Sequence, residues 1–241
     1  MKYAPPTRLP DENEKQGTIA DRICNQLKND IIEGRLAQGS KIIEEDLAKD
    51  YGSSRGPIRE AIRRLEGMRL VERIPHAGAR VVTLTAERMH DLYIVREALE
   101  GMSARLAAEH MDEAEIKALW ELLEYQEQAI SNTEGKLYFQ REGDLDFHFR
   151  IARSSDNQWL IHLLGSELYQ LMRMCRYRSA RVRSRSTTAL QEHRRIVEAI
   201  AAGDGELAEI LMRRHISGAW EIVKELVPYD AAFSDEAGMN G

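Results

Sequence analysis

Residues 53–84 read SSRGPIREAIRRLEGMRLVERIPHAGARVVTL, and the pattern changes near the middle of this stretch. The first half has apolar residues at helical spacing, with Ser54 suited to the N-cap. Pro57 is tolerated in the first helical turn, where no intrahelical N–H bond is lost. The second half holds two β-prone runs, 70–74 and 79–84, joined by a Pro/Gly turn. We therefore predict a helix followed by a β-hairpin.

Two further helices are expected immediately before this stretch. Residues 18–34 carry Ile19, Ile23, Leu27 and Ile31 on one stripe and stop at Gly34, and residues 44–52 form a shorter helical segment. Three short helices followed by a hairpin predict a winged helix-turn-helix domain over residues 17–85.

The rest of the chain has a helical pattern. No proline occurs between Pro75 and Pro228, so residues 86–227 are proline-free, and six segments have apolar residues three or four apart. We expect a mostly α protein, in which an antiparallel six-helix bundle over residues 86–227 follows the winged domain. Residues 1–16 hold three of the six prolines and are expected to be a disordered arm, and residues 228–241 a flexible tail.

The cysteines and the N-terminal sequence indicate the cellular compartment in which the protein is expected. The chain has 241 residues and two distant cysteines, Cys24 and Cys175, which argues against a disulfide framework or a thiolate zinc site. The N-terminal 16 residues contain no apolar run that could act as a signal peptide or a membrane span. These features favour a cytoplasmic protein without membrane association.

Charge is distributed unevenly along the chain. The net charge is −6, but residues 18–85 carry 12 Lys/Arg against 10 Asp/Glu, a net of +2. Residues 51–80 alone carry seven Arg against three Glu, a net of +4. A basic segment on an acidic protein is a candidate phosphate-contacting face. The alternative is an ordinary solvated helix.

In helix-turn-helix proteins the N-terminal end of the recognition helix meets base edges in the major groove. An Arg side chain can grip guanine O6 and N7 together or clamp a phosphate. A glycine at the helix start lets the backbone approach DNA closely, and the tip of the wing can contact phosphate or the minor groove. Arg64 and Arg69 have the alternative interpretation of plain surface charges. The candidate DNA-binding residues are Ser54, Arg55, Gly56, Arg59, Arg63, His76 and Gly78.

A second candidate site lies in the helical half. The sequence DLDFH places Asp144 and His148 four residues apart on one helix face, whereas Asp146 points to another face. His193 and His215 lie on the apolar stripes of two other helices. A lone His on such a stripe is usually a satisfied core residue. Three of them, one with an Asp a turn earlier, favour a divalent metal site. Zinc is the first choice and nickel, iron or manganese are alternatives.

About 65 residues of the winged-domain sequence resemble a known family. The stretch IIEGRLAQGSKIIEEDLAKDYGSSRGPIREAIRRLEGMRLVERIPHAGARVV is similar to the winged-helix domain of the GntR family of bacterial transcription regulators. The resemblance implies that Arg55, Arg59 and Gly78 take DNA-contacting positions. Glu45 stands where many members carry Arg, which implies a different operator preference.

The second half resembles the helical FCD ligand-binding domain of the FadR-like branch, in the shorter VanR-type version. The matching stretches are YIVREALEGMSARLAA, DLDFHFRIARSSDN, EHRRIVEAI and MRRHI. The resemblance implies metal ligation by Asp144, His148, His193 and His215, and a small organic acid as effector. Arg96 matches an Arg that often faces the ligand pocket, with a surface salt bridge as the alternative.

These features predict an effector-responsive regulator, a repressor rather than an activator, that binds double-stranded operator DNA. One recognition helix reads few base pairs, so we expect a homodimer on a near-palindromic operator. The small residues Gly101, Ser103, Ala104, Ala107 and Ala108 suit a helix at the dimer interface. A metal-dependent enzyme is the rival hypothesis, but no GxSxG or HExxH motif is present, and we expect no enzymatic activity. A third possibility is a metal ion with a purely structural role in the helical bundle.

Overall fold

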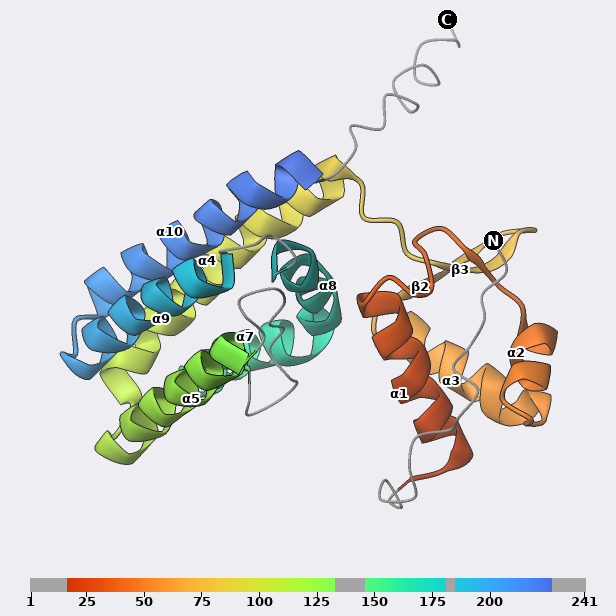
Figure 1. Ribbon diagram of the computed structural model, residues 1–241, viewed down its shortest axis with the longest axis horizontal. Coiled ribbons are helices and arrows are strands. Elements are labelled where there is room, and N and C mark those ends of the chain that lie inside the picture. Colours follow the sequence, from red (N-terminus) through yellow and green to blue (C-terminus); the bar gives the residue numbers. More distant parts are fainter. Residues whose placement is uncertain (1–16, 133–145, 181–184, 227–241) are drawn as a thin grey trace, which may run out of the picture. The chain divides into compact units, whose positions relative to one another are not determined.

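The computed structural model describes residues 17–132, 146–180 and 185–226 (Figure 1). The expected arm, residues 1–16, and the expected tail, residues 228–241, lie outside this part of the chain, and so does Asp144. None of the helices in the described ranges has the length and apolar character that a membrane span requires.

The N-terminal part is a winged helix-turn-helix, as the sequence predicts. Its elements are α1 (Ile19–Ile32), β1 (Lys41–Ile42), α2 (Glu44–Asp50), α3 (Arg55–Gly67), β2 (Val71–Ile74) and β3 (Gly78–Val81). The strands form an antiparallel sheet in the order β1-β3-β2. The sequence pattern does not predict β1, because two residues show no alternation. β1 forms by pairing Lys41 with Arg80 of β3.

Helices α1 and α3 pack against each other through the stripes that the sequence predicts, except that Ile19, in the first turn of α1, is 50% exposed and lies outside this core. Thr18 and Asp21 form a reciprocal capping box that starts α1, and Gly34, with φ +75°, follows its end. α3 begins after Ser54, whose extended backbone takes the N-cap position. The side chains in this core are at most 1% exposed: Ile23, Leu27, Ile31, Ile58, Ala61, Ile62 and Leu65.

The C-terminal part is helical throughout its described residues. Its helices are α4 (Ala86–His110), α5 (Glu113–Asn132), α6 (Phe147–Arg153), α7 (Gln158–His162), α8 (Tyr169–Ala180), α9 (Arg185–Ala201) and α10 (Gly205–Val223). These helices occupy the six segments expected from the sequence. The fourth segment is divided into α7, a π-helical turn (Leu163–Glu167) and α8, and a short 3-10 helix (Lys224–Leu226) follows α10. The mostly α fold class is confirmed.

Helices α4 and α10 run side by side over most of their length (Figure 1). Glycines permit this close approach. A Cβ on Gly101 of α4 would lie 2.7 Å from Cγ of Arg213, and one on Gly205 of α10 would lie 3.0 Å from the carbonyl oxygen of Arg105. The neighbouring small residues Ser103, Ala104 and Ala107 are buried as well. The small-residue face of α4 is therefore occupied within the chain.

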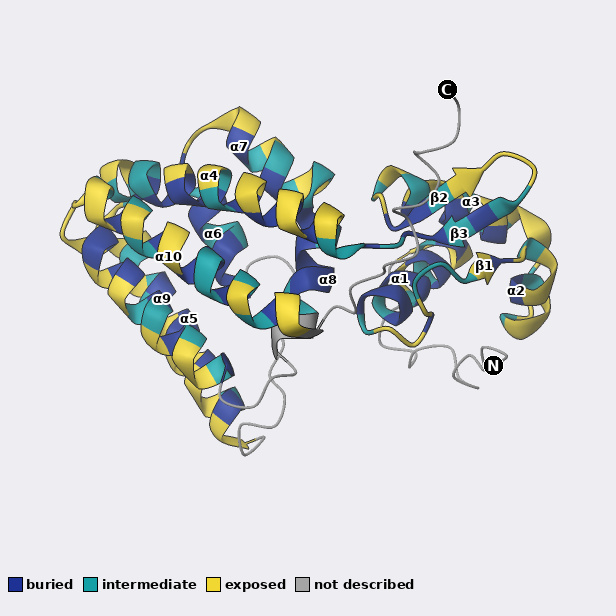
Figure 2. Cartoon of the chain, turned by 90° about the horizontal axis from the view of Figure 1, so that it is seen from above, coloured by how far each residue is buried: buried dark blue, intermediate teal, exposed yellow. Residues whose placement is uncertain are grey.

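Burial in the helical part is concentrated on the inward faces of the helices. Figure 2 shows exposed residues along the outer sides of α4, α5 and α10, and a largely buried α6. α6 packs on α4, and α9 packs on α5 and α10. This arrangement brings side chains from α4, α6, α9 and α10 into one interior.

Candidate functional site

The first candidate surface is the N-terminal end of α3. Arg55, Arg59 and Arg63 all extend from this helix, with 63%, 62% and 72% of their side chains exposed. Gly56 lies between them, and a Cβ at this position would meet no atom within 4 Å. Three exposed guanidinium groups and an open backbone position form a surface that can approach a nucleic acid.

Two of these Arg side chains are held by carboxylates of α2, which the sequence pattern did not predict. Arg55 lies 3.3 Å from Glu45, and Arg59 lies 3.2 Å from Glu44. Because these partners are 10 and 15 residues apart, the pairing depends on the turn between α2 and α3 and leaves no periodic signal. Exposed ion pairs contribute only about 0–1 kcal/mol, so phosphate or a base edge can replace the carboxylates.

Other basic residues of this part have structural partners. Arg64 contacts Asp21 of α1 as well as Glu60 of α3, and Arg80 donates to the carbonyl oxygen of Gly39 at 2.9 Å. These contacts fit the alternative in which Arg64 is not a DNA contact.

The wing lies in the β2–β3 hairpin. Its turn contains His76 with φ 62°, and Gly78, the first residue of β3, has φ +86°. His76 is exposed at the tip and Gly78 is half-buried.

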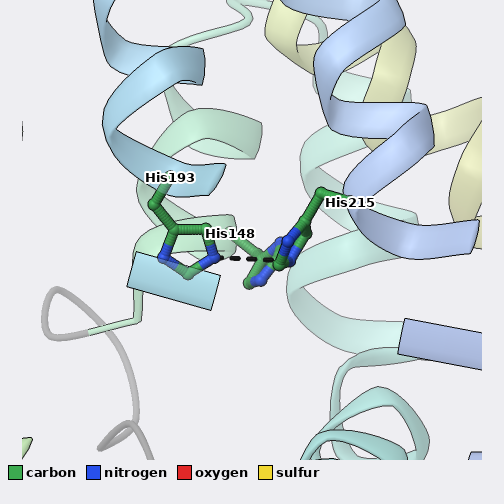
Figure 3. Close-up of side chains that lie close together, drawn as sticks. All are labelled: His148, His193 and His215. Atoms are coloured by element: carbon green, nitrogen blue, oxygen red, sulfur yellow. Dashed lines mark hydrogen bonds between the residues drawn. The ribbon is translucent and has the colours of Figure 1, made fainter. Parts of the chain in front are cut away.

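The second candidate site is a cluster of three imidazoles inside the helical part. His148 comes from α6, His193 from α9 and His215 from α10, and they are 6%, 2% and 5% exposed. One ring nitrogen from each lies within 4.8 Å of those of the other two. Figure 3 shows the three rings converging, with Nε2 of His193 3.3 Å from Nε2 of His215. The structure thus brings together the three His that the sequence singles out.

This geometry fits a metal ion. Two nitrogens that each lie about 2.05 Å from one tetrahedral zinc ion are roughly 3.3 Å apart, and the Nε2 atoms of His193 and His215 have this separation. Asp144, the fourth expected ligand, lies outside the described residues. Asp146 has a different role. It caps α6 by accepting from the N–H groups of His148 and Phe149, and it pairs with Arg176 at 2.7 Å.

The protonation of the cluster also suits metal binding. Burial lowers the pKa of each of the three imidazoles, and the pKa of His215 falls to about 4 although its contact with Glu192 acts in the opposite direction. The pKa of His193 is lowered further by the neighbouring His215 and His148. All three rings are therefore neutral at pH 7, which is the state in which a ring nitrogen can bind a metal.

Two carboxylates lie behind the cluster. Oε2 of Glu100 is 2.6 Å from Nδ1 of His148, and Oε2 of Glu192 is 2.6 Å from Nδ1 of His215. Burial would raise the pKa of Glu100, but Arg96 and His148 hold it well below its ordinary value. Neither carboxylate was predicted from the sequence. Two features of the sequence could have indicated them. Glu100 follows Arg96 by four residues, the spacing of a helical ion pair, and Glu192 directly precedes His193, a candidate metal ligand.

Arg96 is interior. It is 1% exposed, donates from Nε to Glu100 at 2.7 Å, and lies over the Tyr93 ring at 4.8 Å. Its Nη1 and the Tyr93 hydroxyl have no hydrogen-bond partner among the described residues. The surface salt bridge that was the alternative for Arg96 is therefore wrong, because the ion pair that it makes is buried.

A winged helix-turn-helix joined to a helical domain with a buried cluster of imidazoles defines a class of protein, the ligand-responsive DNA-binding regulators. Residues 19–81 match the family model described as bacterial regulatory proteins, gntR family, and residues 91–218 match the FCD domain. The chain belongs to the GntR family with an FCD domain. It is a DNA-binding transcription regulator and not an enzyme.

Curated relatives agree with this assignment. The chain is 34% identical over 203 residues to the uncharacterized HTH-type transcriptional regulator YdhC of Bacillus subtilis, covering 84% of this chain and 90% of the relative. It is 29% identical over 205 residues to a probable D-xylose utilization operon transcriptional repressor of Paenarthrobacter nicotinovorans, covering 83% and 86%.

Solved structures share the fold. McbR/YncC of E. coli superposes with a TM-score of 0.66 at 20% identity, covering 88% of this chain and 99% of the other. A putative GntR transcriptional regulator from Rhodococcus sp. RHA1 gives a TM-score of 0.66 at 23% identity, covering 85% and 97%.

Proposed function

We propose that this regulator is a homodimeric repressor whose FCD domain binds one divalent metal ion, zinc by preference, and a small carboxylate effector. The convergence of three buried, neutral imidazoles from α6, α9 and α10 is the observation that carries this proposal. A relative named as a transcriptional repressor supports the sign of regulation.

The metal ligands in this proposal are His148, His193, His215 and Asp144. Three imidazoles and one carboxylate leave a position open on a five- or six-coordinate ion. The ion, when bound, would supply positive charge that attracts a carboxylate into this interior. The unpartnered Nη1 of Arg96 is a further donor that an acidic effector can use.

The DNA contacts are assigned to α3 and the wing. Arg55, Arg59 and Arg63 reach base edges or phosphates, and the exposed Gly56 permits close approach of the backbone. Ser54 at the head of α3, and His76 and Gly78 in the wing, complete the proposed DNA-binding surface.

Dimer formation is assigned to the outer face of α4. Four of the five small residues of α4 are buried within the chain and Ala108 is half-buried, so this face is not available for an interface. Ile94, Val95 and Met102 are 53%, 41% and 40% exposed, and Ile94 and Met102 share one face because they are eight residues apart. We assign the interface to these apolar side chains in place of the small ones. Light scattering at micromolar concentration should give twice the chain mass, and a monomer would contradict the assignment.

The experiment that tests the proposal compares His193→Ala with His162→Ala, which changes an exposed imidazole outside the cluster. Zinc per chain is measured in the purified proteins. Thermal shifts are then recorded with a panel of small carboxylic acids, and binding to operator DNA is measured in the presence and absence of any acid that shifts the wild type. His193→Ala should lose zinc and the acid response together and still bind DNA, whereas His162→Ala should behave as wild type.

The same experiment separates the effector site from a purely structural metal. If zinc only stabilises the packing of the helices, zinc removal will lower the unfolding temperature of the wild type without changing its affinity for the acid. Full zinc occupancy and a normal acid response in His193→Ala would show that the three His are core residues.

A further inference from the structure

The interior of the helical domain contains two three-residue relays of the same composition. In the first, Arg96 and Glu100 of α4 form an ion pair at 2.7 Å, and Oε2 of Glu100 lies 2.6 Å from Nδ1 of His148 on α6, within ion-pair distance but without the angles of a hydrogen bond. In each relay the Arg and the Glu share one helix, and the His lies on a helix that packs against it.

The second relay uses other helices, and here the Arg also reaches the imidazole, because Nη2 of Arg185 lies 3.4 Å from Nδ1 of His215. Arg185 and Glu192 of α9 form an ion pair at 2.7 Å, and Glu192 contacts Nδ1 of His215 on α10 at 2.6 Å. Because the two relays use different helices and different residue spacings, a shared helix periodicity does not explain them.

We infer that Glu100 and Glu192 are positioning residues of the metal centre: each holds the Nδ1 side of one imidazole so that its Nε2 faces the ion. The inference rests on the metal site proposed above. In this inference neither carboxylate is a ligand itself, since each lies beside Nδ1 of its imidazole and leaves Nε2 for the ion.

The chemistry of imidazole supports this role. A neutral imidazole carries one N–H and one lone pair, and a carboxylate next to Nδ1 selects the form with the proton on Nδ1 and the lone pair on Nε2. The carboxylate also makes the other ring nitrogen a stronger electron-pair donor to a metal. Loss of a carboxylate that contacts a metal-binding imidazole in this way weakens metal affinity by about 10- to 100-fold. The Arg of each relay keeps its carboxylate charged and fixes its orientation.

Fold stability alone is a weak explanation for these groups. Arg96 and Glu100 have side-chain exposures of 1% and 3%. A buried ion pair is often no more stabilising than well-packed apolar side chains, because removing two charges from water is costly. A role in holding His148 explains why the charges are placed at this position.

His193 lacks such a relay. Its Nδ1 makes neither a hydrogen bond nor an ion pair with any described residue, whereas Nδ1 of His148 lies 2.6 Å from a carboxylate oxygen, and the His193 ring stacks on Phe147 with centroids 3.9 Å apart. Two ligands of the centre are therefore oriented by carboxylates and the third by ring stacking. This difference predicts that carboxylate variants weaken metal binding without abolishing it.

Zinc affinity of the full chain, measured by competition with a chromophoric chelator, tests the inference. Glu100→Gln and Glu192→Gln should bind zinc about 10- to 100-fold more weakly. The effect of Glu192→Gln should be the smaller one, because the Glu192 side chain is 29% exposed and solvent screens its charge. The matched control is Glu127→Gln, which breaks an interhelical ion pair with Arg194 outside the relays and should leave zinc affinity unchanged.

Two further measurements separate positioning from folding. Cobalt substituted for zinc reports the ligand geometry by its visible absorption, and the spectrum should change in the relay variants and stay the same in Glu127→Gln. Nitrogen NMR of the imidazoles in the metal-free protein should show His148 and His215 protonated on Nδ1 in wild type. In the Gln variants the population protonated on Nε2 should grow.

The outcomes are distinguishable. If wild-type protein binds no zinc, the proposed metal function fails, and the metal-free NMR measurement still decides the positioning of the two rings. Wild-type zinc affinity in both Gln variants, or Nε2 protonation of both rings in wild type, would overturn the inference. If Glu100→Gln does not fold because Arg96 loses its partner, zinc affinity and imidazole protonation are measured in Glu192→Gln, where the substituted side chain is more exposed.

Discussion

Replacement of Arg59 by alanine tests the DNA-reading surface most directly. The Arg59 side chain is 62% exposed, and its Nε and Nη2 lie 3.3 and 3.2 Å from Oε2 of Glu44. An exposed pair of this kind contributes about 0–1 kcal/mol to stability, so the substitution should leave the fold intact. We propose that in the DNA complex the same guanidinium exchanges the carboxylate for a base edge or a phosphate.

Loss of one good Arg–base contact costs about 1–3 kcal/mol, which corresponds to roughly a 5- to 150-fold increase in the dissociation constant. The assay is fluorescence anisotropy at fixed salt, with an operator selected from random DNA. Urea unfolding of the same samples verifies the fold. Arg194→Ala is the control, because it removes one positive charge from an ion pair in the helical domain and should leave DNA binding unchanged.

The opposite change is expected for Glu44→Gln. It removes the carboxylate that competes with DNA for Arg59, so affinity should rise by at most about fivefold, the equivalent of an exposed ion pair. Equal dissociation constants for wild type and Arg59→Ala, with both proteins folded, would refute the assignment of α3 as the DNA-reading helix.

Three other outcomes are expected. Gly205→Ala should lower the free energy of unfolding by about 1–3 kcal/mol in urea titrations, because its Cβ would lie 3.0 Å from the carbonyl oxygen of Arg105. An unchanged urea midpoint would contradict the tight packing of α4 against α10. Contacts with Arg64 and Thr18 lower the pKa of Asp21 from 3.8 to about 2, so its stabilising effect is complete above pH 4 and is lost as pH falls towards 2. The difference in urea midpoint between wild type and Asp21→Asn should shrink over this pH range, and a constant difference would exclude the carboxylate as its cause. Removal of metal with a chelator should lower the unfolding temperature and zinc should restore it, whereas a temperature insensitive to both would argue against a bound ion.

The elements with strong periodicity were predictable from the sequence. The apolar stripes of α1 and α3 and the long proline-free run gave the winged helix and the helical domain, and both are confirmed. The placement of His193 and His215 on apolar stripes likewise predicted their burial. Periodicity specifies which face of a helix is buried, and this information was sufficient for these residues.

Partners between helices were not predictable in the same way. The contacts of Glu100 with His148 and of Glu44 with Arg59 depend on the rotation and axial position of two helices relative to each other, and a single sequence does not encode these visibly. The two-residue strand β1 and the π-helical turn after α7 were missed because each is too short to show a period. Whether Asp144 is a ligand stays a prediction, since it lies outside the described residues.

The distribution of the three imidazoles along the chain has a consequence for folding kinetics. His148 and His193 are 45 positions apart (148 to 193), and His193 and His215 are 22 positions apart, so one ion would close two long loops. α6 has only seven residues, too few to persist as a helix before the longer helices give it a surface to pack on. We therefore expect the site to form late in folding. By then the packing of the longer helices has already closed both loops, and the entropy of closing them has been lost. We expect a bound ion to slow unfolding strongly and to leave the folding rate almost unchanged, so that metal governs how long each folded molecule lasts.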